Sequence, residues 1–190
     1  MNLPDGWKLD LLIPPASEPV TLPEAKNYAR VEIADDDDLI ESLIVAARIQ
    51  VEHRTRRALL PQQWRLSFDG PIILPITLPK PPIISVDAIS YRTSSGSFAP
   101  VDLSKLVVGL GTPGQINHAP LAYWCPPLPQ IGGCQIDFTA GYADVDHVPA
   151  NVKLAIKWLV NFWYVHRSED GVIPDFVDRL LSPSFYMSYP

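Results

Sequence analysis

The chain has 190 residues, 47% of them hydrophobic, which is enough for one domain with a sizeable core or for one domain with an insertion. A formal net charge of −6 argues against a protein whose whole surface binds nucleic-acid phosphates. No apolar run approaches the roughly 20 residues of a membrane span, so we expect no membrane-spanning helix.

The first predicted helix starts at Thr21 and ends near Val31. Thr21 and Glu24 form a capping box: the threonine hydroxyl can accept a bond from the amide of the third helical residue, and the glutamate can reach back to the N-cap amide. Pro23 is harmless in a first turn, where amides lack partners inside the helix.

A second, longer helix is predicted to start within Asp35–Asp38 and to run to about Ala58. Apolar residues recur at helical spacing along it. Four aspartates suit the positive N-terminal end of the helix dipole, and three arginines, Arg54, Arg56 and Arg57, suit its negative C-terminal end.

The middle of the chain is rich in proline and poor in charge, and it is typical of short β-strands separated by turns. Because proline donates no ladder hydrogen bond, we expect a small barrel or sandwich instead of a large continuous sheet. The predicted strands are Gln62–Asp69, Ile83–Tyr91, Phe98–Val101, Leu106–Leu110, Gln115–Asn117 and Gly133–Tyr142.

A third long helix is predicted near Pro149, with the proline at its first helical position, and it should end around His166–Ser168. Pro174–Leu181 is expected to form a short final helix, and Ser182–Pro190 an aromatic tail. The predicted fold class is therefore α+β: a small bundle of three main helices and a short C-terminal helix, with an inserted β subdomain that resembles a barrel or sandwich.

We expect one folded unit with an insertion. Residues 1–60 would form a lead-in and the first helices, residues 61–147 the β-rich insertion, and residues 148–190 the third helix and a C-terminal docking segment.

Motifs for catalysis, metal binding or cofactor binding are not convincing. Gly109–Gly114 has the letters of a dinucleotide-binding loop, but the residues that follow predict a strand or turn instead of the required helix. Asp35–Asp38 has the wrong spacing for a calcium loop, and His147 is expected to be a loop histidine that precedes a helix. We therefore predict no catalytic, metal-binding or cofactor-binding residues and no cofactor.

Two cysteines are too few for a disulfide framework. The spacing of Cys125 and Cys134 would allow a bond, but two unlinked thiols in a reducing cytoplasm are the simpler expectation. No signal peptide is visible.

The order of these segments resembles the head–tail adaptor (connector) proteins of long-tailed bacteriophages and of phage-derived gene transfer agents. One departure is Arg57, where the resemblance predicts a small turn residue. The segments that carry the resemblance are Pro19–Lys26 with Arg30-Val31, Asp36–Ile40 with Ala46–Arg48 and Val51-Glu52, Thr55–Leu60 with Gln63-Trp64, Leu78-Pro79 and Pro82–Val86 with Tyr91, and Thr139–Tyr142 with Val148-Pro149, Val152-Lys153 and Ala155-Ile156.

The resemblance implies a structural, non-enzymatic virion protein, made in the cytoplasm of a bacterial host and located at the head–tail interface. Such proteins form a ring, usually twelvefold, beneath the portal protein, and they carry the tail-side stopper or tail-completion protein. DNA would pass through the ring without sequence-specific binding, and no membrane is involved. The alternative is a soluble module that binds a ligand or peptide and has no role in a virion; an enzyme is the third hypothesis.

Two sets of residues follow as candidate contact sites. Exposed aromatics near a chain end either pack on the core or dock on a partner, and the resemblance favours docking on the portal. Deleting residues 174–190 is then expected to abolish docking and to leave the fold intact. The docking set is Phe176, Leu180, Leu181, Phe185, Tyr186 and Tyr189; the set for contacts between ring subunits is Asp35, Asp36, Asp37, Asp38, Arg54, Arg56 and Arg57.

Overall fold

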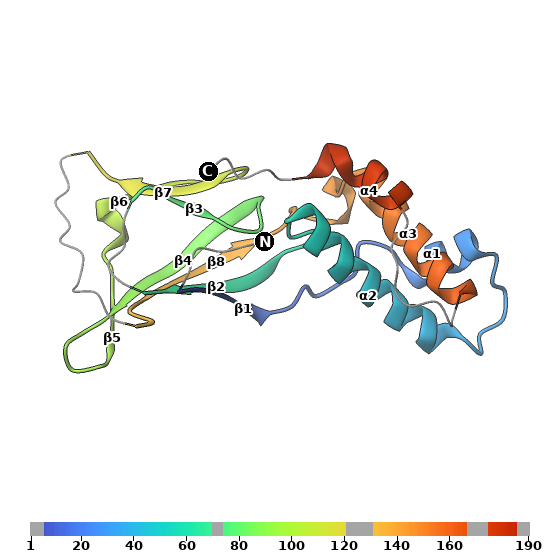
Figure 1. The fold of residues 1–190 in the computed structure, drawn as a ribbon, viewed down its shortest axis with the longest axis horizontal. Coiled ribbons are helices and arrows are strands. Elements are labelled where there is room, and N and C mark those ends of the chain that lie inside the picture. Colours follow the sequence, from blue (N-terminus) through green and yellow to red (C-terminus); the bar gives the residue numbers. More distant parts are fainter. Residues whose placement is uncertain (1–5, 70–73, 121–130, 167–174, 186–190) are drawn as a thin grey trace. The chain divides into compact units, whose positions relative to one another are not determined.

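The computed structural model describes residues 6–69, 74–120, 131–166 and 175–185. The chain forms two compact units. One, the β unit, contains residues 1–15 and 61–141, and the other, the helical unit, contains residues 16–60 and 142–190. Mixed helices and antiparallel strands confirm the α+β class (Figure 1).

A five-stranded antiparallel sheet is the main element of the β unit. Its central strand, β8, buries every second residue, since successive side chains of a strand point to opposite faces. The sheet order is β1 (Trp7–Ile13), β2 (Gln62–Phe68), β8 (Cys134–Ala140), β4 (Ile83–Arg92) and β5 (Phe98–Pro100).

A second sheet has three strands in the order β3 (Ile76–Leu78), β7 (Gly114–His118) and β6 (Leu106–Gly109). The two sheets meet where β7 begins: a Cβ added to Gly114 would lie 2.1 Å from the Ile83 side chain, so this close approach requires glycine. Neither sheet closes on itself within the described residues, and the expected barrel is therefore not found.

Two expectations for the β part need correction. The prolines do not prevent a sheet of five strands, because almost all of those in the described part lie between strands, and Pro100 ends the edge strand β5. The lead-in is also not separate from the β unit, since β1 pairs with β2 and Trp7 stacks on Phe68 at a ring-centroid distance of 4.8 Å.

The helical unit contains α1 (Leu22–Ala29), α2 (Asp37–Thr55), α3 (Ala150–Val165) and α4 (Asp175–Leu181). The capping box at Thr21 is confirmed: its hydroxyl accepts from the Glu24 amide at 3.4 Å, and its own amide donates to the Glu24 carboxylate at 2.8 Å. Pro149 is the N-cap of α3 and not its first helical residue. Helix α2 ends at Thr55, before the predicted Ala58, because Arg56 turns into the left-handed region with φ 57°.

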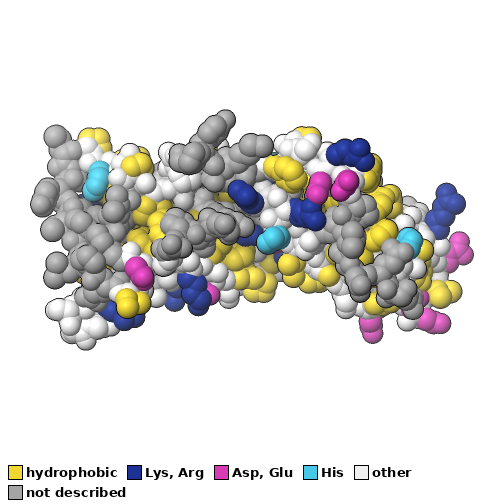
Figure 2. All heavy atoms as spheres, in the orientation of Figure 1, with side chains coloured by type: hydrophobic (Ala, Val, Ile, Leu, Met, Phe, Trp, Pro, Cys, Tyr) yellow, Lys and Arg dark blue, Asp and Glu magenta, His cyan; other side chains and the backbone are white. Residues whose placement is uncertain are grey.

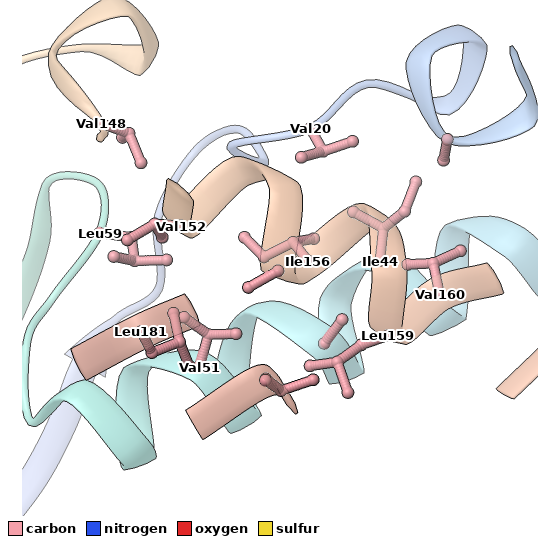
Figure 3. Packing of buried hydrophobic residues seen from close by; sticks show 14 of the residues in the cluster. Val20, Ile44, Val51, Leu59, Val148, Val152, Ile156, Leu159, Val160 and Leu181 are labelled. Atoms are coloured by element: carbon pink, nitrogen blue, oxygen red, sulfur yellow. The ribbon is translucent and has the colours of Figure 1, made fainter. Parts of the chain in front are cut away.

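The core of the helical unit lies between α2 and α3, and Figure 3 shows side chains from several chain segments pointing into it. Residues from before α1 and after α2 complete it: Val20 is 1% exposed and Leu59 is fully buried. Each apolar side chain removed from water here contributes about 1.5–3 kcal/mol before the entropy cost of ordering the chain. No helix among the described residues is both long enough and apolar enough to cross a membrane.

Candidate docking and ring-contact surfaces

The C-terminal segment is packed onto the helical unit. Leu181 and Val177 of α4 are buried in its core. The Asn151 side chain of α3 donates to the Leu180 carbonyl at 3.0 Å and to the Ser184 hydroxyl at 2.9 Å. Because hydrogen bonds and buried apolar contacts act together, α4 is an integral part of this unit.

The six candidate docking residues therefore have different environments. Phe176 is 45% exposed, whereas Leu181 is fully buried. Leu180 and Phe185 are half-buried against the core. Tyr186 and Tyr189 lie outside the described residues.

The expectation that residues 174–190 can be deleted without harm to the fold is wrong. That deletion removes Val177 and Leu181 from the core, and large-to-small changes at such positions alone cost about 2–5 kcal/mol. Only the exposed and half-buried side chains of this segment can be tested for docking by substitution.

Phe176 belongs to a row of aromatic side chains that continues along α3. Its ring lies 5.8 Å from that of Trp158, Trp158 stacks on Phe162 at 5.1 Å, and Phe162 stacks on His166 at 4.5 Å. The sequence analysis did not single out this row. Its signal was the repeat of an aromatic ring every four residues, which places 158, 162 and 166 on one helix face.

The four aspartates before and within the start of α2 also differ in environment. Asp36 accepts a hydrogen bond from the Tyr164 hydroxyl at 2.6 Å, and Asp37 pairs with Lys26. Asp35 and Asp38 are exposed, and no ion pair is found for either among the described residues. These last two remain accessible for a contact with another chain.

The three arginines of the candidate ring set are also divided. Arg54 forms an ion pair with Asp178, and Arg57 donates from Nε to the Ser184 carbonyl at 2.8 Å. Arg57 thereby holds the C-terminal segment, which explains a long cation where the resemblance predicts a small turn residue. Arg56 is exposed.

A buried charge network joins three parts of the helical unit. Arg48, only 6% exposed, donates to Glu18 at 2.8 Å and to Glu52 at 3.0 Å, and Glu52 accepts from the Leu59 amide at 2.9 Å. Burial raises the pKa of Glu18, and the nearby Arg48 opposes this effect. Sequence analysis missed this network, because Arg48 looks like any other charge on an amphipathic helix.

The remaining sequence motifs have local structural roles. Asp144 accepts from the backbone amides of Asp146 at 2.9 Å and His147 at 3.1 Å, so it caps the short turn Val145–His147. The loop from Gly109 to Gly114 connects β6 to β7, and no helix follows it. Among the described residues, no group of His, Cys, Asp or Glu could hold a metal ion.

Acidic and basic side chains occur on the described surface of both units (Figure 2). Figure 2 shows acidic and basic side chains together on the helical unit, with hydrophobic side chains between them. A mixed surface of this kind suits contacts that combine charge pairs with apolar patches.

Comparison with known proteins agrees with the resemblance drawn from the sequence. Residues 19–97 match the model of the phage gp6-like head-tail connector protein family, which confirms the resemblance over this segment. No curated protein sequence matches the chain.

The fold also matches chains in solved structures of gene transfer agent particles. A chain from the virion of a native particle has a TM-score of 0.77 at 22% identity, with 96% of this chain and 97% of that chain covered. A chain from the neck of an empty particle, computed with C6 symmetry, has a TM-score of 0.76 at 23% identity. A third, from the neck of a native particle computed with C12 symmetry, has a TM-score of 0.68 at 21% identity. Both neck matches also cover 96% of this chain and 97% of the other.

Proposed function

We propose that this protein is a head–tail adaptor: a structural, non-enzymatic virion protein that forms a ring at the junction of a DNA-filled capsid and its tail. The observation that carries the proposal is the agreement in fold along nearly the whole chain with chains of gene transfer agent particles, two of them from particle necks. The connector-family match over residues 19–97 supports the same role. It acts as a structural part and catalyses no reaction.

The partners we propose are the portal protein above the ring, a tail-side stopper or tail-completion protein below it, and further copies of the same chain. Twelve copies would suit the C12 symmetry with which one of the matching necks was computed. A net charge of −6 would let DNA move through the ring without sequence-specific binding, because the phosphates are repelled.

Portal docking is assigned to the accessible side chains of the C-terminal segment, with Phe176 as the principal one and half-buried Phe185 as a second. Aromatic residues are enriched in the energetically important centres of interfaces. Phe176 has 45% of its surface free to contact a partner while its ring edge is positioned by Trp158.

The docking assignment is tested by co-expressing the protein with the portal protein of the same particle and measuring how much portal it retains on an affinity resin. Phe176→Ala is expected to reduce portal retention at least tenfold, since truncating a central aromatic costs 2 kcal/mol or more. The matched control is Phe98→Ala, which removes a phenylalanine of similar exposure, 39%, from the β unit.

The outcomes separate the docking site from the function. An equal reduction of portal retention by both variants, or no reduction by Phe176→Ala, would contradict the assigned docking site. Failure of the unchanged protein to retain the portal would contradict the adaptor function itself.

A further inference from the structure

Helix α3 also carries apolar side chains that the core of the helical unit leaves exposed or only half-buried. Its buried face consists of residues such as Val152, Ile156 and Leu159. On the other side, Leu154 is 39% exposed and Val165 is 63% exposed, with half-buried Trp158 between them along the helix. At helical spacing of 3.6 residues per turn these three side chains form one ridge. We call Leu154, Trp158 and Val165 the α3 ridge.

The same unit has an apolar groove elsewhere on its surface. The groove has a volume of about 340 Å³ and is lined by the segment before and at the start of α1 and by α2; no residue of α3 lines it. Leu22 and Val45 supply accessible apolar surface, and Glu41 and the Arg48-paired Glu18 also line it. We call this site the α1–α2 groove.

Charge on the two surfaces is complementary. Lys153 and Lys157 lie on α3 beside the ridge, and among the described residues neither forms a salt bridge, although both act on Glu24 at longer range. Glu41 at the groove is exposed, and it has no ion pair in the described part of the chain. Glu18 is already paired with Arg48, so the attraction across the contact would come from Glu41 and the lysines beside the ridge, and it favours one direction of the contact.

We propose that the α3 ridge of one copy of this protein occupies the α1–α2 groove of the next copy. This inference rests on the proposed ring function and names the surfaces that build the ring. A closed ring requires a heterologous contact between two different faces of each subunit. The ridge and the groove are two different apolar faces of one unit, with lysines beside the first and Glu41 at the second.

The acidic and basic ends of α2 are less suited to this role. Partners inside their own unit already bind four of these residues, Asp36, Asp37, Arg54 and Arg57. Breaking those contacts would lower the stability of the unit. A new ion pair at a surface contributes only about 0–1 kcal/mol and would not compensate for that loss. An apolar ridge in a groove gains by excluding water and leaves these pairs intact.

The test is disulfide trapping between copies that are bound to the portal. Leu154→Cys places a thiol on the ridge, and Val45→Cys places one in the groove; the two native positions have similar exposure, 39% and 38%. Under mild oxidation the double variant is expected to form a ladder of covalent multimers at least tenfold more abundant than in either single variant. A heterologous contact predicts this ladder, because every copy then carries both halves of each bond.

Two controls are needed. The unchanged protein, which retains Cys125 and Cys134, measures the background of the native thiols. Leu154→Cys combined with Leu103→Cys, a residue with the same 39% exposure in the β unit, should stay at that background.

Retention of the portal without a ladder from the double variant would overturn the proposed contact and leave the adaptor function standing. Covalent dimers from either single variant in which the bond maps to two copies of the introduced cysteine would also overturn it, because they indicate a contact between identical faces. A bond from Val45→Cys to the portal or to a tail protein would assign the groove to that partner instead. If the unchanged protein does not retain the portal, that result contradicts the proposed adaptor function and does not test this contact.

Charge reversal gives an independent measurement. Glu41→Lys and Lys157→Glu are each expected to lower the yield of portal-bound multimers several-fold, and the double variant is expected to restore it. If the two losses simply multiply in the double variant, the two charges do not face each other across the contact.

Discussion

At the scale of single residues, Arg48 shows how a charge that looks ordinary in the sequence can organise a fold. Its guanidinium contacts Glu18 before α1 and Glu52 near the end of α2, and Glu52 in turn holds the Leu59 amide. The network thus fixes both ends of the segment that runs from the lead-in to the end of the α2 region. Its contribution to the stability of the fold depends on burial, since exposed ion pairs of the same type contribute little.

Arg48→Ala is expected to destabilise the protein by about 3–5 kcal/mol, because it removes the buried cation that two carboxylates share. Arg54→Ala in the same helix, whose partner Asp178 is about a third exposed, should cost about 1 kcal/mol or less. Urea denaturation monitored by circular dichroism measures both. Equal costs for the two variants would mean that the network is not a principal source of stability.

The contact between His147 and Asp144, which caps the turn Val145–His147, depends on pH. The Nδ1 of His147 lies 2.7 Å from Asp144, and the hydrogen bond to that carboxylate, followed by its charge, raises the pKa of His147. Because the pKa of His147 is raised in the folded state, its contact with Asp144 stabilises the folded protein in full below the ordinary histidine pKa of about 6.5. This stabilisation is lost as the pH rises through the folded-state pKa.

Asp144→Asn is therefore expected to return the pKa of His147 to its ordinary range, as measured by an NMR titration of the imidazole protons. The unchanged protein, titrated under the same conditions, is the reference. An unaltered His147 curve would exclude the carboxylate as the cause of the shift.

At the scale of elements, the ends of α2 are set by backbone geometry that sequence periodicity does not report. Apolar periodicity continues to Ala58, but the helix stops at Thr55 because Arg56 adopts φ 57°, a conformation in which a side chain is disfavoured. Glycine would adopt it without that cost.

Arg56→Gly is expected to leave stability unchanged or to raise it by up to about 1 kcal/mol. Ala46→Gly, at an exposed position inside the same helix, should lower it by about 1 kcal/mol. The difference between the two variants in chemical denaturation checks the assignment of the helix end. A loss for Arg56→Gly as large as that for Ala46→Gly would contradict it.

The helices and most strands could be predicted from the sequence because each has a local signal. Thr21 and Glu24 mark the start of α1, and the alternation of Leu66 and Phe68 marks β2. Strand β1 was missed because its apolar residues Leu11-Leu12-Ile13 do not alternate, and because its pairing with β2 joins residues far apart in the chain.

The candidate contact sites were harder to predict than the elements. A list of charged residues at helix ends does not reveal which of them already have partners: Asp37 and Arg54 do, and Asp38 and Arg56 remain exposed. The C-terminal segment stood out in the sequence by its aromatic residues, but the burial of its side chains could not be predicted from residue type, since Leu181 is in the core and Phe176 is not.

At the scale of the whole molecule, the chain crosses between its two units three times, near residues 15, 60 and 141. Each unit has its own framework, a five-stranded sheet in one and a helical core in the other. All of the proposed contact surfaces, which are the portal docking site, the α3 ridge and the α1–α2 groove, belong to the helical unit.

The central claim, that the protein is a ring-forming adaptor between head and tail, is tested most directly by cryo-electron microscopy of the neck of particles purified from the host that encodes it. The account predicts a ring of copies of this chain, with its α+β fold, between the portal and the first tail component. A neck reconstructed at side-chain resolution in which another protein occupies that position would contradict the account.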